Sequence, residues 1–264
     1  MNIDLGGQVA LLVGAGAPGD VASNGRAIAL ALSAAGASVA LLDKSDDVLA
    51  ACAAAITAGG GNCTSHVADV ADEASTLRAI EDVFKRHGHV DVLVFNVGIP
   101  HFGKLPSIAR EEYERVFAIN VFPAMSIARH ILPSMESRQR GVFTFVSSVS
   151  SVRHLGISSP LYDTSKAALA ALSRHIAVQY AAKGIRSNVL LLGMLDTPLA
   201  RNAIAQAGKD IGTVYEKYNS GIPAKRLGKA EEVAAAALFL SSDAASYING
   251  AELAVDGGLI ARAG

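Results

Sequence analysis

The sequence has few cysteines, and their scarcity excludes two kinds of stabilised site. Cys52 and Cys63 are the two cysteines in 264 residues, so neither a disulfide framework nor a four-ligand zinc pattern is available. The nearest approach to a pair of metal ligands is His87 and His89, in a helix-to-strand turn that we interpret as a solvated loop. We therefore expect no metal, and a reducing cytoplasm is the simplest location for such a chain.

Strong charge of one sign and long apolar runs are also missing. The 23 Lys and Arg residues nearly balance 24 Asp and Glu residues, and no basic block of the kind that binds nucleic acid occurs. No uninterrupted apolar run reaches the ~20 residues that a membrane span needs. The N-terminus lacks the pattern of a signal peptide, so we take it as the start of the fold. These absences predict a soluble protein that binds neither nucleic acid nor membrane.

The length and composition of the chain suit one large domain over residues 1–264, with 51% hydrophobic residues for its core. Short apolar runs alternate with helical patterns, which predicts an α/β fold, a Rossmann-type doubly wound sheet of about seven parallel strands with helices on both faces. The cofactor half would span about 1–140 and the catalytic and substrate half about 141–264.

The element boundaries follow from the same alternation. Apolar runs predict strands over residues 9–16, 39–43, 63–70, 90–98, 141–150, 185–193 and 250–258. Helical patterns predict helices over residues 24–35, 45–58, 73–87, 111–135, 161–184 and 230–242. We expect Pro133 and Gly184 to mark the ends of two of these helices, and residues 199–223 to form a mobile helical lid.

A glycine-rich turn lies between the first predicted strand and the first predicted helix. Gly14 begins the turn, and Ser23, Asn24 and Gly25 end it. Glycines let a backbone approach a pyrophosphate, and a helix N-terminus supplies free N–H groups, so the position indicates a dinucleotide site. Asp43 ends the second predicted strand.

A carboxylate at the position of Asp43 accepts hydrogen bonds from both ribose hydroxyls and repels a 2′-phosphate. It therefore predicts NAD as the cofactor, with NADP less favoured. Lys44 follows at once and weakens the preference, because a cation tolerates a phosphate.

Tyr162 and Lys166 open an alanine- and leucine-rich helix four residues apart, so they share one face of it. The pair follows the fifth predicted strand, which ends in Val146, Ser147 and Ser148. Ligands in such sheets bind beyond the carboxyl ends of the strands. The other residues near those ends are Asp69, Val70, Asn96, Val97 and Gly98, and the long helix before the fifth strand carries Asn120.

Over essentially its whole length, the chain resembles the single-domain short-chain dehydrogenases/reductases. The resemblance is carried by the glycine turn, Asp69-Val70, Asn96-Val97-Gly98, Asn120, the serine-rich strand end, Tyr162-x-x-x-Lys166 and the tail Val255-Asp256-Gly257-Gly258. It implies an enzyme that transfers a hydride between a nicotinamide cofactor and a secondary alcohol or ketone.

The resemblance also implies a role for each matching residue. Tyr162 would be the acid/base, and Lys166 would stabilise its phenolate and hold the nicotinamide ribose. Ser148 would hydrogen-bond the substrate oxygen, and Asn120 would anchor a water that links Lys166 to solvent. Ser150 is the alternative to Ser148. The cofactor contacts would be Gly14, Ser23, Asn24, Gly25, Asp43, Asp69, Val70, Asn96, Val97, Gly98, Tyr162 and Lys166, with Leu195 and Thr197 at the carboxamide.

The chain departs from the family pattern in the glycine turn and after the sixth strand. The turn is longer than usual, with Val13 in place of a threonine, and its middle position is either Gly19 or Ser23. Leu192 stands where the family commonly has proline, which removes a restriction on φ from that turn.

The substrate pocket would be walled by loops after strands four, five and six. These loops offer Arg153 and His154 as polar candidates for substrate contact, besides Pro100, His101, Phe102, residues 149–159, Met194 and residues 199–222. We expect a homotetramer in which the helix that carries Tyr162 is one contact, through an alanine stripe at Ala167, Ala168, Ala170 and Ala171.

Two other functions compete with this hypothesis. A 3-oxoacyl-[acyl-carrier-protein] reductase would share the catalytic residues, but such enzymes usually prefer NADPH and carry a basic patch for the acidic carrier. Asp43 and the balanced charge argue against it. A non-catalytic NAD-binding sensor would often lack the tyrosine or the lysine, and both are present here.

Overall fold

The computed structural model describes residues 3–17, 22–206 and 208–262. Seven parallel strands form one sheet in the order β3-β2-β1-β4-β5-β6-β7. The strands are β1 (Val9–Val13), β2 (Ser38–Asp43), β3 (Cys63–Val67), β4 (Val92–Phe95), β5 (Gly141–Ser148), β6 (Ile185–Leu192) and β7 (Glu252–Val255). The predicted doubly wound parallel sheet is confirmed, and its strand order reverses between β1 and β4.

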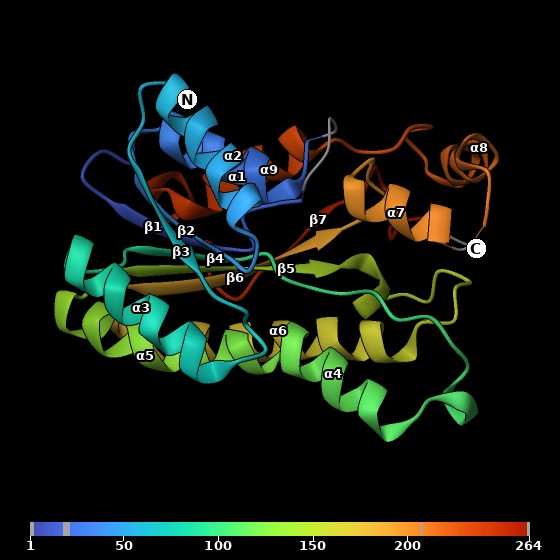
Figure 1. Ribbon diagram of the computed structural model, residues 1–264, viewed down its shortest axis with the longest axis horizontal. Coiled ribbons are helices and arrows are strands. Elements are labelled where there is room, and N and C mark those ends of the chain that lie inside the picture. Colours follow the sequence, from blue (N-terminus) through green and yellow to red (C-terminus); the bar gives the residue numbers. More distant parts are fainter. Residues whose placement is uncertain (1–2, 18–21, 207, 263–264) are drawn as a thin grey trace.

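Helices cover both faces of the sheet (Figure 1). They are α1 (Asn24–Ala34), α2 (Asp46–Ala58), α3 (Glu73–His87), α4 (Arg110–Asn120), α5 (Phe122–Arg138), α6 (Pro160–Gln179), α7 (Pro198–Gln206), α8 (Ile211–Gly221) and α9 (Ala230–Ser241). Two hydrophobic clusters fill the spaces between the layers. One lies between the sheet and α1, α2 and α9, and the other lies between the sheet and α3, α5 and α6.

The central strands are apolar throughout because both of their faces are covered. All residues of β1 and β4 are buried, and seven of the eight in β5 are buried. The edge strand β3 differs, since His66 is its one buried residue. Burial on both sides therefore explains why unbroken apolar runs, rather than alternating ones, marked the strands in the sequence.

Side-chain caps set the beginnings of several helices. Ser23, Ser45 and Asp72 accept hydrogen bonds from the backbone N–H groups at the start of α1, α2 and α3. These short polar side chains satisfy N–H groups that have no partner inside a helix. Gly88 ends α3 in the left-handed conformation, with φ of 79°.

Two expected helix ends are wrong. Pro133 lies inside α5, which continues to Arg138. A proline costs a helix about 3 kcal/mol, and burial of neighbouring apolar residues, among them Ile131 and Met135, offsets that loss. Similarly, α6 ends at Gln179, and a 3-10 turn (Ala181–Lys183) leads to Gly184, whose φ of 68° ends the segment.

His87, the last residue of α3, and His89, in the turn that follows, are not simply solvated. The Nε2 atom of His87 lies 2.8 Å from Oγ1 of Thr64 on β3, and Nε2 of His89 lies 3.0 Å from Oδ2 of Asp91. Among the described residues, no group of three or more His, Cys, Asp or Glu side chains is arranged to hold a metal ion.

The segment Arg110–Arg138 is long and apolar enough to cross a membrane by length and composition alone. In the fold it forms two helices, α4 and α5, separated at Val121. Residues Ala124, Ile127 and Ile131 of α5 are buried in the core cluster beneath the sheet. The apolar character of this segment is explained by that packing.

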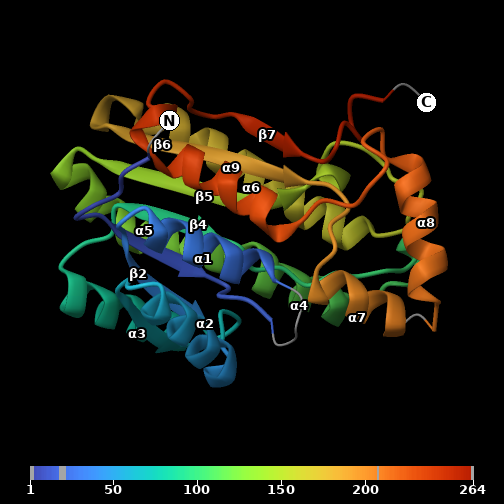
Figure 2. The same ribbon diagram turned by 90° about the horizontal axis from the view of Figure 1, so that it is seen from above.

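The helices α7 and α8 lie beyond the carboxyl ends of the strands, near the C-terminal tail. Figures 1 and 2 show them at the same end of the sheet from two directions. They occupy the segment 199–223 that the sequence predicted to be a helical lid. This end of the sheet carries the residues singled out in the sequence.

Candidate active site

The two ends of the glycine turn meet despite its length. Gly14 has φ of 88°, and a Cβ added to Gly25 would lie 2.1 Å from the carbonyl oxygen of Gly14. Only glycine permits this approach at position 25. The turn therefore brings the end of β1 directly onto the first residues of α1. Gly19, one candidate for its middle position, lies outside the described residues.

The start of α1 has the donors and acceptors that a dinucleotide requires. The Oγ atom of Ser23 caps the helix by accepting from the N–H of Arg26 at 3.4 Å. The Oδ1 atom of Asn24 is buried and has no hydrogen-bond partner among the described residues. Buried polar atoms are normally paired, so this orphaned oxygen fits a site for a polar ligand. A nicotinamide cofactor is therefore compatible with this cradle.

Asp43 is the last residue of β2, as predicted, and Asp69 lies two residues beyond β3, which is shorter than the predicted strand. One oxygen of Asp43 accepts from the N–H of Ser45 at 3.1 Å. Asp69 accepts from the N–H of Ala71 at 2.9 Å, and Val70 follows it in the same turn. Each carboxylate thus supports its own loop.

Asn96 connects the two strands at which the sheet order reverses. Its Nδ2 donates to the carbonyl oxygen of Gly14 at 3.0 Å, and its N–H donates to Val13 at 2.9 Å. Val97 and Gly98 follow, and a Cβ added to Gly98 would lie 2.6 Å from Nζ of Lys166. Gly98 therefore leaves room for the lysine.

Tyr162 lies in the first turn of α6, beside the end of β5. Burial raises the pKa of its hydroxyl to about 12, opposed by a hydrogen bond with Ser148 and reinforced by Asp163. Ser148 in turn accepts from the N–H of Ser150 at 3.2 Å and from its hydroxyl at 3.0 Å. Of the two serines considered, Ser148 is the one that lowers the pKa of the tyrosine, and Ser150 donates to it.

Lys166 lies one turn further along α6 and is almost completely buried, with 3% of its surface exposed. Its Nζ donates to the carbonyl oxygens of Val97 and Val146, each at 3.0 Å, and lies 5.8 Å from the centroid of the Tyr162 ring. Burial lowers the pKa of Lys166 to about 8. The ammonium therefore bridges the ends of β4 and β5.

Asn120 is fully buried at the end of α4 and organises the same loop. Its amide exchanges two hydrogen bonds with the backbone of Ile99, at 2.8 and 3.1 Å, and donates to Oγ of Ser165 at 2.9 Å. These bonds occupy both ends of the side chain. The expected water contact of Asn120 stays a prediction.

Leu195 and Thr197 lie in the loop after β6, and both are buried. The hydroxyl of Thr197 accepts from the N–H of Ala200 at 3.3 Å, at the start of α7. The residue between them, Asp196, bonds to both lid helices and was not identified from the sequence. An acidic residue in a loop gives no local signal of which distant helices it will meet.

Of the two polar candidates for substrate contact, His154 is exposed and Arg153 has partners within the protein, as does His101 of the predicted pocket wall. Arg153 donates to the backbone oxygens of Ile260 and Arg262 in the C-terminal tail. His101 is buried and lies 2.8 Å from Glu112. Its neighbour Phe102 is exposed.

The chain matches a family model described as enoyl-(acyl carrier protein) reductase over residues 19–260. It is 36% identical to 2-(R)-hydroxypropyl-CoM dehydrogenase of Xanthobacter autotrophicus, over 95% of this chain and 97% of that protein. It is 33% identical to levodione reductase of Leifsonia aquatica, over 95% of this chain and 93% of that protein. Both relatives are named for reactions of alcohols or ketones.

Solved structures share the whole architecture. A Burkholderia xenovorans protein assigned to the short-chain dehydrogenases/reductases is 36% identical and superposes with a TM-score of 0.94, over 98% of this chain and 99% of that one. A gluconate 5-dehydrogenase from Burkholderia cenocepacia, solved with NADP and tartrate, is 28% identical with a TM-score of 0.89, over 99% and 98% of the two chains.

Proposed function

The chain belongs to the short-chain dehydrogenase/reductase family, and on that premise we propose that it is an NAD-dependent oxidoreductase acting on a secondary alcohol or ketone. The observation that carries the proposal is the grouping of Tyr162, Ser148 and Lys166 at the carboxyl ends of β4 and β5. A nicotinamide cofactor, when bound, supplies or accepts the hydride.

Tyr162 moves the proton in this proposal. In reduction its hydroxyl donates a proton to the carbonyl oxygen, and in oxidation its phenolate takes one from the alcohol. Ser148 holds the reacting oxygen through the same hydroxyl that bonds Tyr162. Because burial raises the pKa of Tyr162 to about 12, nearby positive charge is needed to populate the phenolate at neutral pH.

Lys166 is the protein's own cation at this point. Its buried ammonium uses two of three N–H groups on Val97 and Val146, which leaves one donor for the nicotinamide ribose. Asn120 positions this region through Ile99 and Ser165. The remaining contacts to the cofactor are proposed for Gly14, Ser23, Asn24, Gly25, Asp43, Asp69, Val70, Asn96, Val97, Gly98, Leu195 and Thr197.

The choice of NAD over NADP is proposed from Asp43. Its bond to Ser45 leaves lone pairs that can accept ribose hydroxyls and that repel a 2′-phosphate. Lys44, which follows Asp43 directly, opposes this preference because a cation tolerates a phosphate. The structurally similar gluconate 5-dehydrogenase of Burkholderia cenocepacia was solved with NADP rather than NAD.

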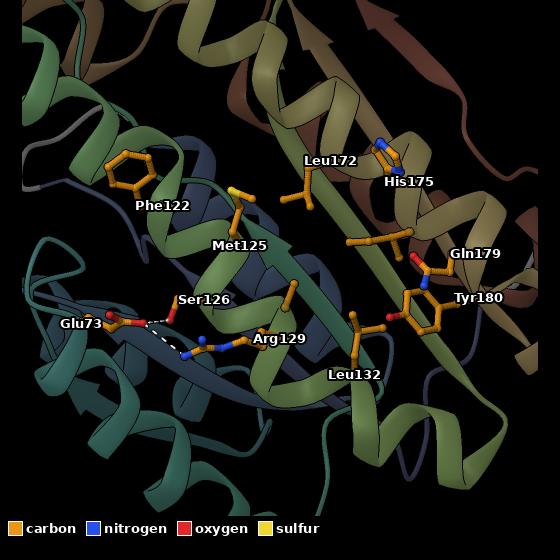
Figure 3. Close-up of a pocket in the computed structure, with 12 residues that line it drawn as sticks. Glu73, Phe122, Met125, Ser126, Arg129, Leu132, Leu172, His175, Gln179 and Tyr180 are labelled. Atoms are coloured by element: carbon orange, nitrogen blue, oxygen red, sulfur yellow. Dashed lines mark hydrogen bonds and ion pairs between the residues drawn. The ribbon is translucent and has the colours of Figure 1, made fainter.

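A homotetramer in the cytoplasm is proposed for the assembled enzyme. A groove of about 510 Å³ runs between α5 and α6, and Tyr162 is not among the residues that line it (Figure 3). At its rim Phe122 and Met125 are 56% and 51% exposed, an apolar surface that a second copy would cover. The predicted alanine stripe contributes less, because Ala170 faces the core.

A 3-oxoacyl-[acyl-carrier-protein] reductase remains the alternative, because the matching family model is described for a reductase whose substrate, an enoyl group, is also held by an acyl carrier protein. The balanced charge of the chain opposes it, since an acidic carrier protein is recognised by basic surface. A non-catalytic sensor is disfavoured by the presence of Tyr162 and Lys166.

The test is a screen of NAD reduction with secondary alcohols, hydroxysteroids, sugars and hydroxyacyl thioesters, repeated with NADP. We expect turnover of a secondary alcohol with NAD, and Asp43→Ala should reduce the preference for NAD. Activity restricted to hydroxyacyl thioesters with NADP would favour the alternative. Tight binding of NAD without turnover of any of these compounds would favour the non-catalytic sensor.

A further inference from the structure

Asp196 lies between Leu195 and Thr197, and its carboxylate contacts two other elements. Arg201 of α7 donates from Nε to Oδ1 at 2.7 Å and from Nη2 to Oδ2 at 2.8 Å. Tyr215 of α8 donates its hydroxyl to Oδ1 at 2.7 Å. One carboxylate therefore joins both lid helices to the loop that follows β6.

Backbone contacts hold the loop itself at the base of the lid. The N–H of Asp196 donates to the carbonyl oxygen of Gly228, and the N–H of Gly228 donates to Met194, each at 3.0 Å. Leu195 and Gly228 also form a parallel bridge. The segment that carries α7 and α8 therefore begins after Thr197 and ends before Gly228, and Asp196 lies where the two ends of this segment come together.

Apolar burial does little to hold α8 in place. None of its 11 residues is buried, whereas α7 buries Pro198 and Ile204. Among the described residues, side-chain bonds tie α8 to the chain beyond it: from Tyr215 to Asp196, from Arg262 to the carbonyl oxygen of Gly221 at 2.7 Å, and from Lys225 to the carbonyl oxygen of Ser220 at 2.9 Å. A helix without a buried face depends on such contacts for its position.

The charges of the cluster suit a persistent contact. The hydrogen bonds from Arg201 hold the pKa of Asp196 below its usual range, so the carboxylate stays ionised. Burial, with the bond to Asp196, raises the pKa of Tyr215 to about 12, so the phenol keeps its proton and remains a donor. A charged acceptor with a neutral donor makes a stronger bond than two neutral groups.

We propose that Asp196 is a positioning residue that couples α8 to the loop of Leu195 and Thr197. When the bond between Tyr215 and Asp196 breaks, α8 becomes more mobile, and the loop of Leu195 and Thr197 binds the nicotinamide end of the cofactor less tightly. The link to the cofactor rests on the proposed function, whereas the tie between lid and loop rests on the contacts of the protein alone.

The test compares Tyr215→Phe with Tyr218→Phe, a matched loss of a hydroxyl one turn further along α8. Hydrogen exchange of α8 amides in the cofactor-free protein reports on the lid, and NADH fluorescence titration reports on the cofactor. We expect Tyr215→Phe to speed exchange by about tenfold and to weaken NADH several-fold, as the loss of one bond to a charged group predicts. Tyr218→Phe should behave as the wild type in both.

A second pair of variants separates coupling from general damage. Asp196→Ala should loosen α8 as Tyr215→Phe does, and the double variant should be no worse than Asp196→Ala, because both changes remove the bond between Tyr215 and Asp196. If the effects of Tyr215→Phe and Asp196→Ala on exchange were additive, the two residues would not act through one shared contact. Faster exchange with unchanged NADH affinity would overturn the coupling, as would equal effects of Tyr218→Phe. A chain that binds neither NADH nor NADPH would refute the proposed function and the coupling together, while exchange of α8 would still decide whether Tyr215 holds the lid.

Discussion

The Nζ atom of Lys166 lies 5.8 Å from the centroid of the Tyr162 ring, and it donates to the carbonyl oxygens of Val97 and Val146 rather than to the phenol. The lysine is thus fixed by the sheet and the tyrosine by Ser148. In the protein alone, burial dominates both groups, raising the pKa of the phenol to about 12 and lowering that of the ammonium to about 8. The expected lowering of the Tyr162 pKa by Lys166 is not found in the protein without its cofactor.

Tyr162→Phe should abolish turnover and leave the fold and NADH binding nearly unchanged. The variant removes the hydroxyl that transfers the proton, a contribution of roughly 10²–10⁴ in rate for general acid–base catalysis. Steady-state rates and NADH titration measure the two effects. Tyr180→Phe, at the end of the same helix, is the control and should retain the wild-type rate. Substantial activity in Tyr162→Phe would reject the proton-transfer role.

Ser148→Ala should reduce kcat more than Ser150→Ala does. Ser148 lowers the pKa of Tyr162, whereas Ser150 donates to Ser148 and acts through it. We expect a loss of at least tenfold for Ser148→Ala, of the order of one hydrogen bond to a developing charge, and a smaller loss for Ser150→Ala. Equal or reversed losses, measured by steady-state kinetics, would assign the substrate contact to Ser150.

Gly25→Ala should weaken cofactor binding and destabilise the protein. The added Cβ would lie 2.1 Å from the carbonyl oxygen of Gly14, so the end of β1 and the start of α1 must separate. Gly59→Ala is the control, because its Cβ would meet Ile56 at an ordinary 3.4 Å. Urea unfolding and NADH titration measure both effects, and wild-type behaviour of Gly25→Ala would contradict the close approach.

Stability should fall as the pH drops below the usual pKa of histidine, about 6.5. His66 is 4% exposed, and its ring bonds Thr64 and Asp82 at 2.8 and 3.0 Å. Burial lowers the pKa of His66, against the effect of Asp82. The unfolded chain therefore takes up a proton at higher pH than the folded chain does, and the loss is complete below the lowered folded pKa.

Urea unfolding between about pH 7.5 and pH 5.5 measures this dependence. His66→Gln should be less stable than the wild type at the higher pH and should lose less stability on acidification. His175→Gln changes an exposed histidine of α6 and should retain the wild-type slope. A wild-type slope in His66→Gln would place the titration at another residue, such as His87, whose pKa burial also lowers.

Local pattern predicted most of the elements, because strand and helix periodicity are properties of short segments. It failed where packing outweighed a local signal, as at Pro133 inside α5 and at the histidines that lie against Thr64 and Asp91. Arg153 shows the same limit. A loop arginine can meet substrate, solvent or backbone, and its bonds to Ile260 and Arg262 depend on where a tail more than a hundred residues away folds.

The sequence by itself determined the parallel sheet, the order of strands and helices, and the positions of Tyr162 and Lys166, because four residues along a helix fix a common face. Only the tertiary structure decided that Lys166 joins Val97 to Val146, that Asn120 is engaged with Ile99 and Ser165, and that Asp196 unites both lid helices. The physical reason is that these contacts join atoms whose separation along the chain is large. Their geometry is set by the whole packed sheet rather than by any local preference.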